Sequence, residues 1–435
     1  MSYYSGSRMA DGAILPDEVV ALLAPFGVQA GAVAVAVSGG PDSMALAFCL
    51  QRFWGEDGRV LALIVEHGLR SESAAEAGEV ADRLRGMGME AEILPWQHES
   101  LSSRIHVKAR EARYALLLAA CQKNNIKTLF LAHHADDQAE TVLMRFAKGS
   151  GIDGLAGMAP AREIGGVTLA RPFLTLPKAR LLATCEANGI PFVTDPSNEK
   201  DKYARGRLRR VMPLLAEEGF TAERLTDLGN RAREAKEALE HYTKMFLCES
   251  VEATDVSGTL LLNGEALAAV PRAIALRALA ACLTTLNSTA YAPEREPLSA
   301  LMAWLLTPSA QDVRTLHGCL VQKKAGQKTI RFLREVAAIT DAPSLSFQET
   351  VMWDGRWRVT LLEDRAGLAV RPLGLPTHEV LDALAPALRR QIPSARARAS
   401  LPSVWEEGRL VAIPSFDKVN QAVAVAEWIR PFWLV

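Results

Sequence analysis

The first half of the chain alternates short apolar runs with longer segments of helical periodicity. The apolar runs, which predict buried strands, lie at residues 32–37, 60–65, 90–94 and 128–132. The segments that predict helices lie at residues 43–54, 76–87 and 103–124, and a further helix begins near residue 136. Apolar strands separated by helices are typical of a parallel sheet that is covered on both faces. We therefore predict a doubly wound α/β domain whose ligands bind at the carboxyl ends of the strands.

The pattern changes after about residue 213. Charged helical periodicity predicts helices at residues 222–246, 265–286 and 298–306. From about residue 344, strand-like runs at residues 357–362, 367–371 and 409–414 surround a predicted helix at residues 379–390. The predicted organisation is an α/β domain over residues 1–215, a helical domain over residues 216–335 and a small α+β domain over residues 345–435.

Composition excludes several classes of protein. Of 435 residues, 49% are apolar and 23% are charged, as in ordinary globular proteins. The 49 basic and 50 acidic residues leave a formal net charge of −1, which excludes a uniformly basic nucleic-acid coat. The sequence contains neither an apolar run of the ~20 residues that a membrane span needs nor the pattern of a signal peptide. The six cysteines form no C-x-x-C pair, which argues against a disulfide framework, a zinc ribbon or a sulfur relay and favours a cytoplasmic location.

One motif stands at the junction between a predicted strand and a predicted helix. It consists of Ser38, Gly39, Gly40, Pro41, Asp42 and Ser43. The glycines let the backbone turn tightly beside a ligand, while the helix N-terminus and the serine hydroxyls favour bound phosphate. It matches neither the G-x-x-x-x-G-K-[ST] loop nor the G-x-G-x-x-G loop. A carboxylate beside phosphates is unfavourable without a cation, so Asp42 predicts Mg²⁺ bridging to a polyphosphate. A capped strand–helix turn without a ligand is the structural alternative.

The motif resembles the signature of the ATP pyrophosphatases, which cleave ATP between its α- and β-phosphates. Further motifs, in the same order, are similar to those of the tRNA(Ile)-lysidine synthase family. They are VEHGLR at 65–70, REARY at 110–114, AHHADDQAET at 132–141, GSG at 149–151, GL at 154–155, RPFL at 171–174, DPSN at 195–198 and YARGRLR at 203–209. The resemblance is strong over residues 30–215 and weak beyond them. It implies a PP-loop nucleotide-binding domain of the adenine nucleotide α-hydrolase type.

The resemblance also implies a reaction. ATP adenylates the C2 oxygen of the wobble cytidine in the CAU anticodon of tRNA(Ile), and the amine of L-lysine then displaces AMP. The product, lysidine, pairs with A instead of G and switches decoding from AUG to AUA. ATP and Mg²⁺ are the implied cofactors, while tRNA(Ile) and L-lysine are the implied partners. The sequence does not fix the oligomeric state, with which a homodimer is compatible.

Within that scheme, the acidic residues after the fourth predicted strand become candidates for catalysis. Asp42 and Asp137 are the expected Mg²⁺ ligands, with Asp136 beside them, because a metal ion would neutralise the departing pyrophosphate. Asp137 and Glu140 are three residues apart and can share a helical face. One carboxylate can then bind metal while the other receives the ammonium group of lysine or its proton.

Histidines also follow the predicted strands. His133 and His134 stand at a carboxyl end, where His133 is our candidate for phosphate binding or proton transfer. A polar helix start is the structural alternative, and a zinc site lacks cysteine partners nearby. His67 and Arg70 follow the second predicted strand, where contact with an anion and a structural loop role are about equally supported.

Basic residues form three groups. Arg110 and Arg113 share one face of a predicted helix, where a solvated surface is the alternative to contact with ATP or tRNA. Residues 200–210 hold six basic side chains against one acidic side chain, which is typical of a surface that faces solvent or phosphate. The candidates for tRNA contact are Arg110, Arg113, Arg205, Arg207 and Arg209. Residues 388–402 carry four arginines and no acid, for which the resemblance implies recognition of the tRNA acceptor region and a charged structural face is the alternative.

Two departures from the family pattern concern secondary contacts. Glu66 stands where the family usually has Asp, and Gly206 stands where it commonly has Asn.

Two other functions stay open from the sequence. One is another PP-loop ATP pyrophosphatase, such as a tRNA thiolase, although the cysteine spacing does not favour it. The other is an RNA-binding relative without catalysis, against which the complete Ser38, Gly39, Gly40, Asp42 and Asp137 set argues.

Overall fold

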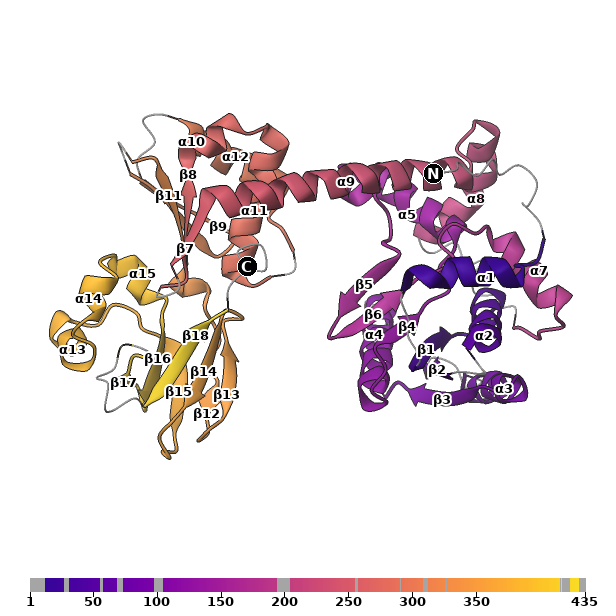
Figure 1. The fold of residues 1–435 in the computed structure, drawn as a ribbon, viewed down its shortest axis with the longest axis horizontal. Coiled ribbons are helices and arrows are strands. Elements are labelled where there is room, and N and C mark those ends of the chain that lie inside the picture. Colours follow the sequence, from indigo (N-terminus) through magenta and orange to yellow (C-terminus); the bar gives the residue numbers. More distant parts are fainter. Residues whose placement is uncertain are drawn as a thin grey trace. The chain divides into compact units, whose positions relative to one another are not determined.

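Two units make up the chain, Met1–Lys236 and Glu237–Val435. Figure 1 draws them from indigo at the N-terminus to yellow at the C-terminus. The structure, a computed structural model, describes residues 12–26, 31–54, 58–68, 73–97, 105–193, 204–254, 257–289, 291–307, 312–324, 327–414, 416 and 423–429. Within these ranges, every helix is too short or too polar to cross a membrane.

A six-stranded sheet organises the first unit. Its strands are β1 (Ala32–Val37), β2 (Arg59–Glu66), β3 (Glu90–Pro95), β4 (Thr128–Phe130), β5 (Ala161–Ile164) and β6 (Val167–Ala170). They lie in the order β3-β2-β1-β4-β6-β5, and β5 alone runs antiparallel to its neighbour. Because the chain continues to β2 on one side of β1 and later returns to β4 on the other, the sheet changes winding direction between β1 and β4. Ligands of doubly wound sheets bind at such a switch point.

Helices precede, connect and follow the strands of this sheet, and the last of them continues into the second unit (Figure 1). They are α1 (Pro16–Leu23), α2 (Pro41–Trp54), α3 (Ser73–Gly86), α4 (Ile105–Lys123), α5 (Ala135–Ala147), α6 (Ile152–Leu155), α7 (Lys178–Ala187), α8 (Ala204–Glu217) and α9 (Ala222–Ser250), with a 3₁₀ turn at Ala24–Phe26. The predicted strands and helices of the first half are therefore all present, with ends that differ by a few residues. The doubly wound α/β fold is confirmed.

The alternation within β1 explains why both faces of the sheet are covered. Val33, Val35 and Val37 point to the core that α1, α2, α3 and α7 share. Ala34 points to the opposite core, where Leu117 on α4 packs. Successive strand residues face opposite sides of a sheet, so the run AVAVAV places large side chains on one face and small ones on the other. Each valine buried in this way contributes about 1.5–3 kcal/mol of hydrophobic stabilisation.

The second unit combines three antiparallel sheets with short helices. The strands are β7 (Val251–Thr254), β8 (Thr259–Asn263), β9 (Asp312–Leu316), β10 (Cys319–Lys323), β11 (Thr329–Arg334), β12 (Ser344–Leu345), β13 (Thr350–Trp353), β14 (Trp357–Leu361), β15 (Leu368–Pro372), β16 (Pro402–Glu406), β17 (Arg409–Ala412) and β18 (Ala424–Trp428). They pair as β7-β8-β11-β10-β9, β12-β15-β16-β17 and β13-β14-β18. The helices are α10 (Gly264–Ala269), α11 (Arg272–Asn287), α12 (Arg295–Leu306), α13 (His378–Leu384), α14 (Leu388–Gln391) and α15 (Ala395–Ala399), with a 3₁₀ turn at Val336–Ala338. One continuous apolar core holds the sheets and helices together.

Two predicted helices of the second half are each divided. The pattern over residues 265–286 becomes α10 and α11, because Pro271 cannot continue the hydrogen-bond ladder and instead caps α11. The pattern over residues 379–390 becomes α13 and α14, with Pro386 between them. The five-stranded sheet of β7 to β11 accompanies α10, α11 and α12, and the helical periodicity did not predict it.

Candidate active site

The SGGPDS loop, residues 38–43, joins β1 to α2 and is stabilised by its own hydroxyl groups. The Ser43 hydroxyl accepts the Ser38 N–H at 3.2 Å and donates to the Gly40 carbonyl at 3.0 Å. The Ser38 hydroxyl lies 3.3 Å from the Ser43 hydroxyl. The loop therefore keeps its turn without a ligand and ends at the N-terminus of a 14-residue helix. Such a helix end attracts anions, which fits the predicted phosphate cradle.

Gly39 is required by both conformation and space. Its φ of +82° lies in the left-handed region, and a Cβ added there would lie 2.6 Å from Val80 Cγ2 on α3. The Gly39 carbonyl accepts the Val193 N–H at 2.8 Å, which joins the loop to the segment after α7. Gly40 differs, since a Cβ there would meet only the Ser38 hydroxyl, at 3.8 Å.

Acidic side chains meet this loop from the neighbouring strand. β1 pairs with β4, so the loop after β1 and the start of α5 after β4 stand side by side. His134 lies at their centre and is 5% exposed. Its Nε2 lies 3.7 Å from Asp42 Oδ2 and 3.4 Å from Asp137 Oδ2, while its Nδ1 lies 3.4 Å from Asp136 Oδ2. The predicted acidic residues Asp42, Asp136 and Asp137 therefore converge on one imidazole.

The charge state of His134 follows from these neighbours. Burial disfavours the charged imidazole, but Asp136, Asp42 and Asp137 outweigh burial and raise the pKa of His134 to about 9. The three carboxylates therefore favour the imidazolium form of His134. The pKa of Asp136 is lowered, first by His134 and also by the Lys178 N–H, which donates to it at 2.9 Å. His133, which we predicted as the catalytic histidine, is half-buried beside His134.

One carboxylate oxygen in the site lacks a hydrogen-bond partner among the described residues. Among the described residues, Asp42 Oδ1 is buried without a hydrogen-bond partner, while Oδ2 faces His134 and lies 4.0 Å from Lys178 Nζ. The part of the chain that the structure describes assembles no cluster of three or more metal-ligating side chains. Mg²⁺ commonly binds through one or two carboxylates together with phosphate oxygens and water. The pair of Asp42 and Asp137 beside a phosphate cradle fits that preference.

Glu140 is engaged by a predicted tRNA-contacting residue. Arg209 Nε on α8 donates to Glu140 Oε1 at 2.5 Å, and Arg209 Nη2 lies 3.7 Å from Asp137 Oδ1. The Glu140 side chain is 5% exposed and the Arg209 side chain is 43% exposed. The hydrogen bond with Glu140 raises the pKa of Arg209. Arg209 therefore shields the two carboxylates of α5 from solvent on one side.

The arginines of α4 surround one aromatic ring. The guanidinium carbons of Arg110 and Arg113 lie 5.5 and 5.7 Å from the centroid of the Tyr114 ring. Burial lowers the pKa of His67, and so does the charge of Arg113, which places the end of β2 beside this helix. Arg171, after β6, also approaches Tyr114, and burial lowers its pKa. Arg110, Arg113 and Arg171 thus gather positive charge around Tyr114, while His67 after β2 lies within reach of Arg113.

Glu66 has a defined structural role in this sequence. Its Oε1 accepts the Gly68 N–H at 2.7 Å and the Ser73 hydroxyl at 2.5 Å. These bonds tie the segment after β2 to the start of α3. The longer glutamate, which replaces the aspartate of the family pattern, therefore organises the loop through its own carboxylate.

Some predicted residues lie elsewhere. Arg207 is exposed on α8, whereas the side chain of Arg205 and residues 69–72 and 194–203, with Arg70, Asp195–Asn198 and Tyr203, lie outside the described residues. In the C-terminal arginine group, Arg389 lies 3.1 Å from Asp382, and buried Arg398 donates to the carbonyls of Ile392 and Pro393. Half of that group is thus used within the fold. The cysteines form no disulfide within the described part of the chain.

Two residues of the site escaped the sequence analysis as functional candidates. They are His134, which the neighbouring His133 displaced, and Lys178, whose ammonium approaches Asp42. The doubled histidine did signal a strand end, but the sequence alone does not say which ring turns inward. Lys178 begins α7 and follows Pro177 at the helix cap, and that position carries no chemical signal of its own.

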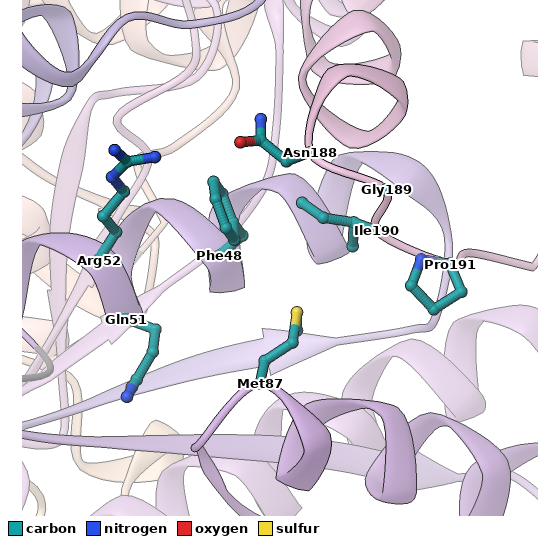
Figure 2. A pocket seen from close by; sticks show the side chains of 8 residues that line it. All are labelled: Phe48, Gln51, Arg52, Met87, Asn188, Gly189, Ile190 and Pro191. Atoms are coloured by element: carbon teal, nitrogen blue, oxygen red, sulfur yellow. The ribbon is translucent and has the colours of Figure 1, made fainter.

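A cavity of about 270 Å³ lies at the far end of α2. In Figure 2 the side chains of Phe48, Met87 and Ile190 converge on it, with Arg52 and Asn188 at its rim. Helices α2, α3 and α7 end here, and helix C-termini present carbonyl groups rather than the N–H groups that bind phosphate. Phe48 lies seven residues into α2, about 10 Å along the helix from Pro41. The lining thus offers helix C-termini and apolar side chains rather than the N–H groups of a phosphate site.

Comparison with known proteins agrees with this geometry. A family model described as a PP-loop domain matches residues 15–215. The chain is 47% identical to the tRNA(Ile)-lysidine synthase of Methylobacterium sp. (strain 4-46) over 283 residues, which cover 64% of this chain and 82% of that protein. It is 44% identical to the enzyme of that name from Methylobacterium nodulans over 312 residues, 69% of this chain and 90% of the relative. With the enzyme of that name from Ruegeria pomeroyi it shares 37% identity over 397 residues, 90% of both chains.

The family-model match spans the SGGPDS loop and the acidic residues that converge on His134. The match to the Ruegeria pomeroyi enzyme covers 90% of this chain and therefore includes most of the second unit. The chain belongs to the tRNA(Ile)-lysidine synthase family.

Proposed function

We propose that this chain ligates L-lysine to the wobble cytidine in the CAU anticodon of tRNA(Ile), with ATP converted to AMP and pyrophosphate. The observation that carries the proposal is the convergence of Asp42, Asp136 and Asp137 on one imidazolium beside a phosphate-binding turn. The membership in a family whose relatives bear the name of this activity supports the same conclusion. The product would switch decoding from AUG to AUA.

The first step joins the cytidine to AMP. The C2 oxygen of cytidine forms a bond to the α-phosphorus of ATP, and the bond from that phosphorus to the pyrophosphate oxygen breaks. Ser38, Gly39, Gly40 and Ser43 would hold phosphate oxygens at the start of α2. The His134 imidazolium and the Lys178 ammonium, both near Asp42, supply positive charge where the pyrophosphate departs.

Mg²⁺ would be held by Asp42 and Asp137, and its chemistry there is to neutralise the charge that develops on the leaving pyrophosphate. The buried, unpartnered Asp42 Oδ1 supports this assignment. Asp136 has a different role, because its carboxylate is used by His134 and by the N–H of Lys178. It would hold the imidazolium in place between the two proposed metal ligands.

The second step forms the new C–N bond. The lysine ammonium gives up one proton and its amine attacks C2, the bond from C2 to the oxygen of AMP breaks, and the nitrogen then releases a second proton. Glu140 is the proposed partner of the lysine ammonium, since its buried carboxylate already binds a cation, Arg209. Lysine would then take part of the place that the guanidinium occupies. His133 is a proposed acceptor of a proton, because neighbouring His134 is already protonated at neutral pH.

The anticodon loop would bind to basic residues around this site. Arg110 and Arg113 beside Tyr114 form one proposed contact, and exposed Arg207 forms another. Arg205 and Arg209 complete the proposed set. Phosphate contacts of this kind contribute affinity that weakens as the salt concentration rises.

The test is transfer of radiolabelled lysine to tRNA(Ile) bearing CAU, in the presence of ATP and Mg²⁺. Asp42→Asn should abolish lysine transfer and pyrophosphate release but leave tRNA affinity unchanged. Asp82→Asn is the matched control, because the Asp82 side chain is 78% exposed and pairs only with Arg85 on the surface of α3. Absence of labelled tRNA with the wild-type protein, or full activity of Asp42→Asn, would contradict the proposal.

A further inference from the structure

Two arginines share one carboxylate in the interior of the second unit. Asp354 stands in the turn between β13 and β14, and Arg334 Nε and Nη2 donate to its carboxylate at 2.9–3.2 Å. Arg356 Nε donates to the same carboxylate at 2.7 Å. Arg334 is 4% exposed, Asp354 is 8% exposed and Arg356 is 2% exposed. The three groups therefore form a buried cluster with two positive charges and one negative charge.

The two guanidinium groups differ in how completely they are bonded. Arg334 also donates to the carbonyl of Gly318 at 2.7 Å and to the carbonyl of Ala338 at 3.0 Å, so every one of its nitrogens is bonded. Arg356 Nη1 and Nη2 are both buried without a hydrogen-bond partner among the described residues. Its guanidinium therefore keeps four N–H donors that no described residue accepts.

The excess charge cannot disappear by titration. Burial lowers the pKa of Arg356, Asp354 opposes this effect, and the charge of Arg334 adds to it. A buried lysine or carboxylate can lose its charge by releasing or taking up a proton, but arginine stays protonated in proteins. An uncompensated charge in the interior carries a large desolvation penalty, so a compensating anion is favoured.

A further buried donor and a glycine backbone adjoin Arg356. Trp357 Nε1, on the next residue, is a further buried donor without a partner among the described residues. Gly258, in the turn before β8, has a φ of +57°, and a Cβ there would lie 3.4 Å from Arg356 Nη1 and 3.1 Å from Trp357 Cζ2. The glycine thus keeps a side chain out of the space beside the unpartnered nitrogens.

We propose that Arg356 Nη1 and Nη2 bind a small inorganic anion of halide size, which compensates the second arginine of the cluster and stabilises the second unit. A phosphate of RNA is excluded as the occupant because only 2% of Arg356 is exposed. The site is independent of the proposed lysine transfer, since all its residues belong to the second unit. The anion joins the turn between β13 and β14 to the turn before β8.

The test compares thermal unfolding of the full-length protein in sodium chloride and in sodium gluconate at equal ionic strength. A ligand that binds only the folded state raises Tm with its concentration. Replacing gluconate with chloride should raise Tm for the wild-type protein and leave Tm of Arg356→Met unchanged. Arg358→Met is the matched control, since Arg358 lies two residues further along the chain, on β14, with its side chain 54% exposed, and it should keep the response to chloride.

A second measurement does not depend on whether Arg356→Met folds. Crystals of the wild-type protein grown in bromide should show an anomalous peak within hydrogen-bonding distance of Arg356 Nη1 or Nη2. Equal Tm of the wild-type protein in the two salts, or an ordered water without an anomalous peak at this position, would overturn the proposal.

Discussion

Gly39→Ala should destabilise the first unit and distort the phosphate cradle. Alanine would have to adopt a φ near +82°, which costs an L-residue about 1–2 kcal/mol. Its methyl group would lie 2.6 Å from Val80 Cγ2, well inside the normal carbon–carbon separation, and overpacking of this kind typically costs about 1–3 kcal/mol. Part of the strain will relax through Val80, so we expect a loss of about 2–4 kcal/mol in the free energy of unfolding.

Gly40→Ala provides the matched control. Gly40 does not have a positive φ, and its added Cβ would make only one contact, at 3.8 Å with the Ser38 hydroxyl. Denaturant unfolding followed by circular dichroism should therefore place Gly40→Ala within about 1 kcal/mol of the wild-type protein. Val80→Ala separates the two causes of strain, because it removes the overlapping methyl group but not the unfavourable φ.

The combined variant Gly39→Ala/Val80→Ala should be less destabilised than the sum of its single changes, since the two sites are in contact. Pyrophosphate release should fall with Gly39→Ala even where the protein is still folded, because the turn carries the N–H groups that bind phosphate. Equal stability of Gly39→Ala and Gly40→Ala, or strict additivity with Val80→Ala, would refute the reasoning.

Two further predictions concern ion pairs of the first unit. Arg209→Met should lower kcat about tenfold, because it removes the guanidinium that holds Glu140 and approaches Asp137 before lysine binds. Arg207→Met should mainly weaken tRNA affinity in a salt-dependent manner, and identical kinetic profiles of the two variants would contradict this. Arg180→Met should cost about 2–3 kcal/mol in urea unfolding at neutral pH, because Arg180 binds Glu18 through two nitrogens, at 2.7 and 3.0 Å, with only 7% of its side chain exposed. Arg180 lowers the pKa of Glu18, so the stabilisation is present above the ordinary glutamate pKa and should vanish as pH falls through the lowered value; an unchanged difference at low pH would be the contrary result.

The sequence predicts the elements of the first unit better than their arrangement. Short apolar runs and helical periodicity located β1 to β4 and the helices between them. This is possible because the burial of one face makes apolar residues repeat at the period of the strand or helix within each segment. The order β3-β2-β1-β4-β6-β5 depends on pairing between distant segments, and no local pattern contains it. The second unit shows the same limit. Its strand β10 alternates only weakly between buried and half-buried positions. The helical periodicity of the neighbouring segments therefore made this strand hard to recognise in the sequence.

Some features of the candidate site can be predicted from residue types alone, whereas others depend on the three-dimensional arrangement of the side chains. The loop Ser38–Ser43 could be predicted because two glycines, two serines and an aspartate at a strand–helix junction leave few other uses. The choice between His133 and His134 could not be predicted from the sequence, because these adjacent histidines differ only in the direction of their side chains. The pairing of Glu140 with Arg209 joins residues 69 positions apart, so it becomes visible only when α8 is placed against α5.

The charge of the assembled site explains why a cation should accompany ATP. Near neutral pH four carboxylates face three cations, because His134, with a pKa of about 9, is protonated. The carboxylates are Asp42, Asp136, Asp137 and Glu140, and the cations are His134, Lys178 and Arg209. One negative charge therefore remains before any substrate binds, and a triphosphate would add several more to a partly buried site. The positive end of α2 offsets only about half a charge. This balance supports the proposal that a divalent cation accompanies ATP at Asp42, whose Oδ1 has no hydrogen-bond partner among the described residues.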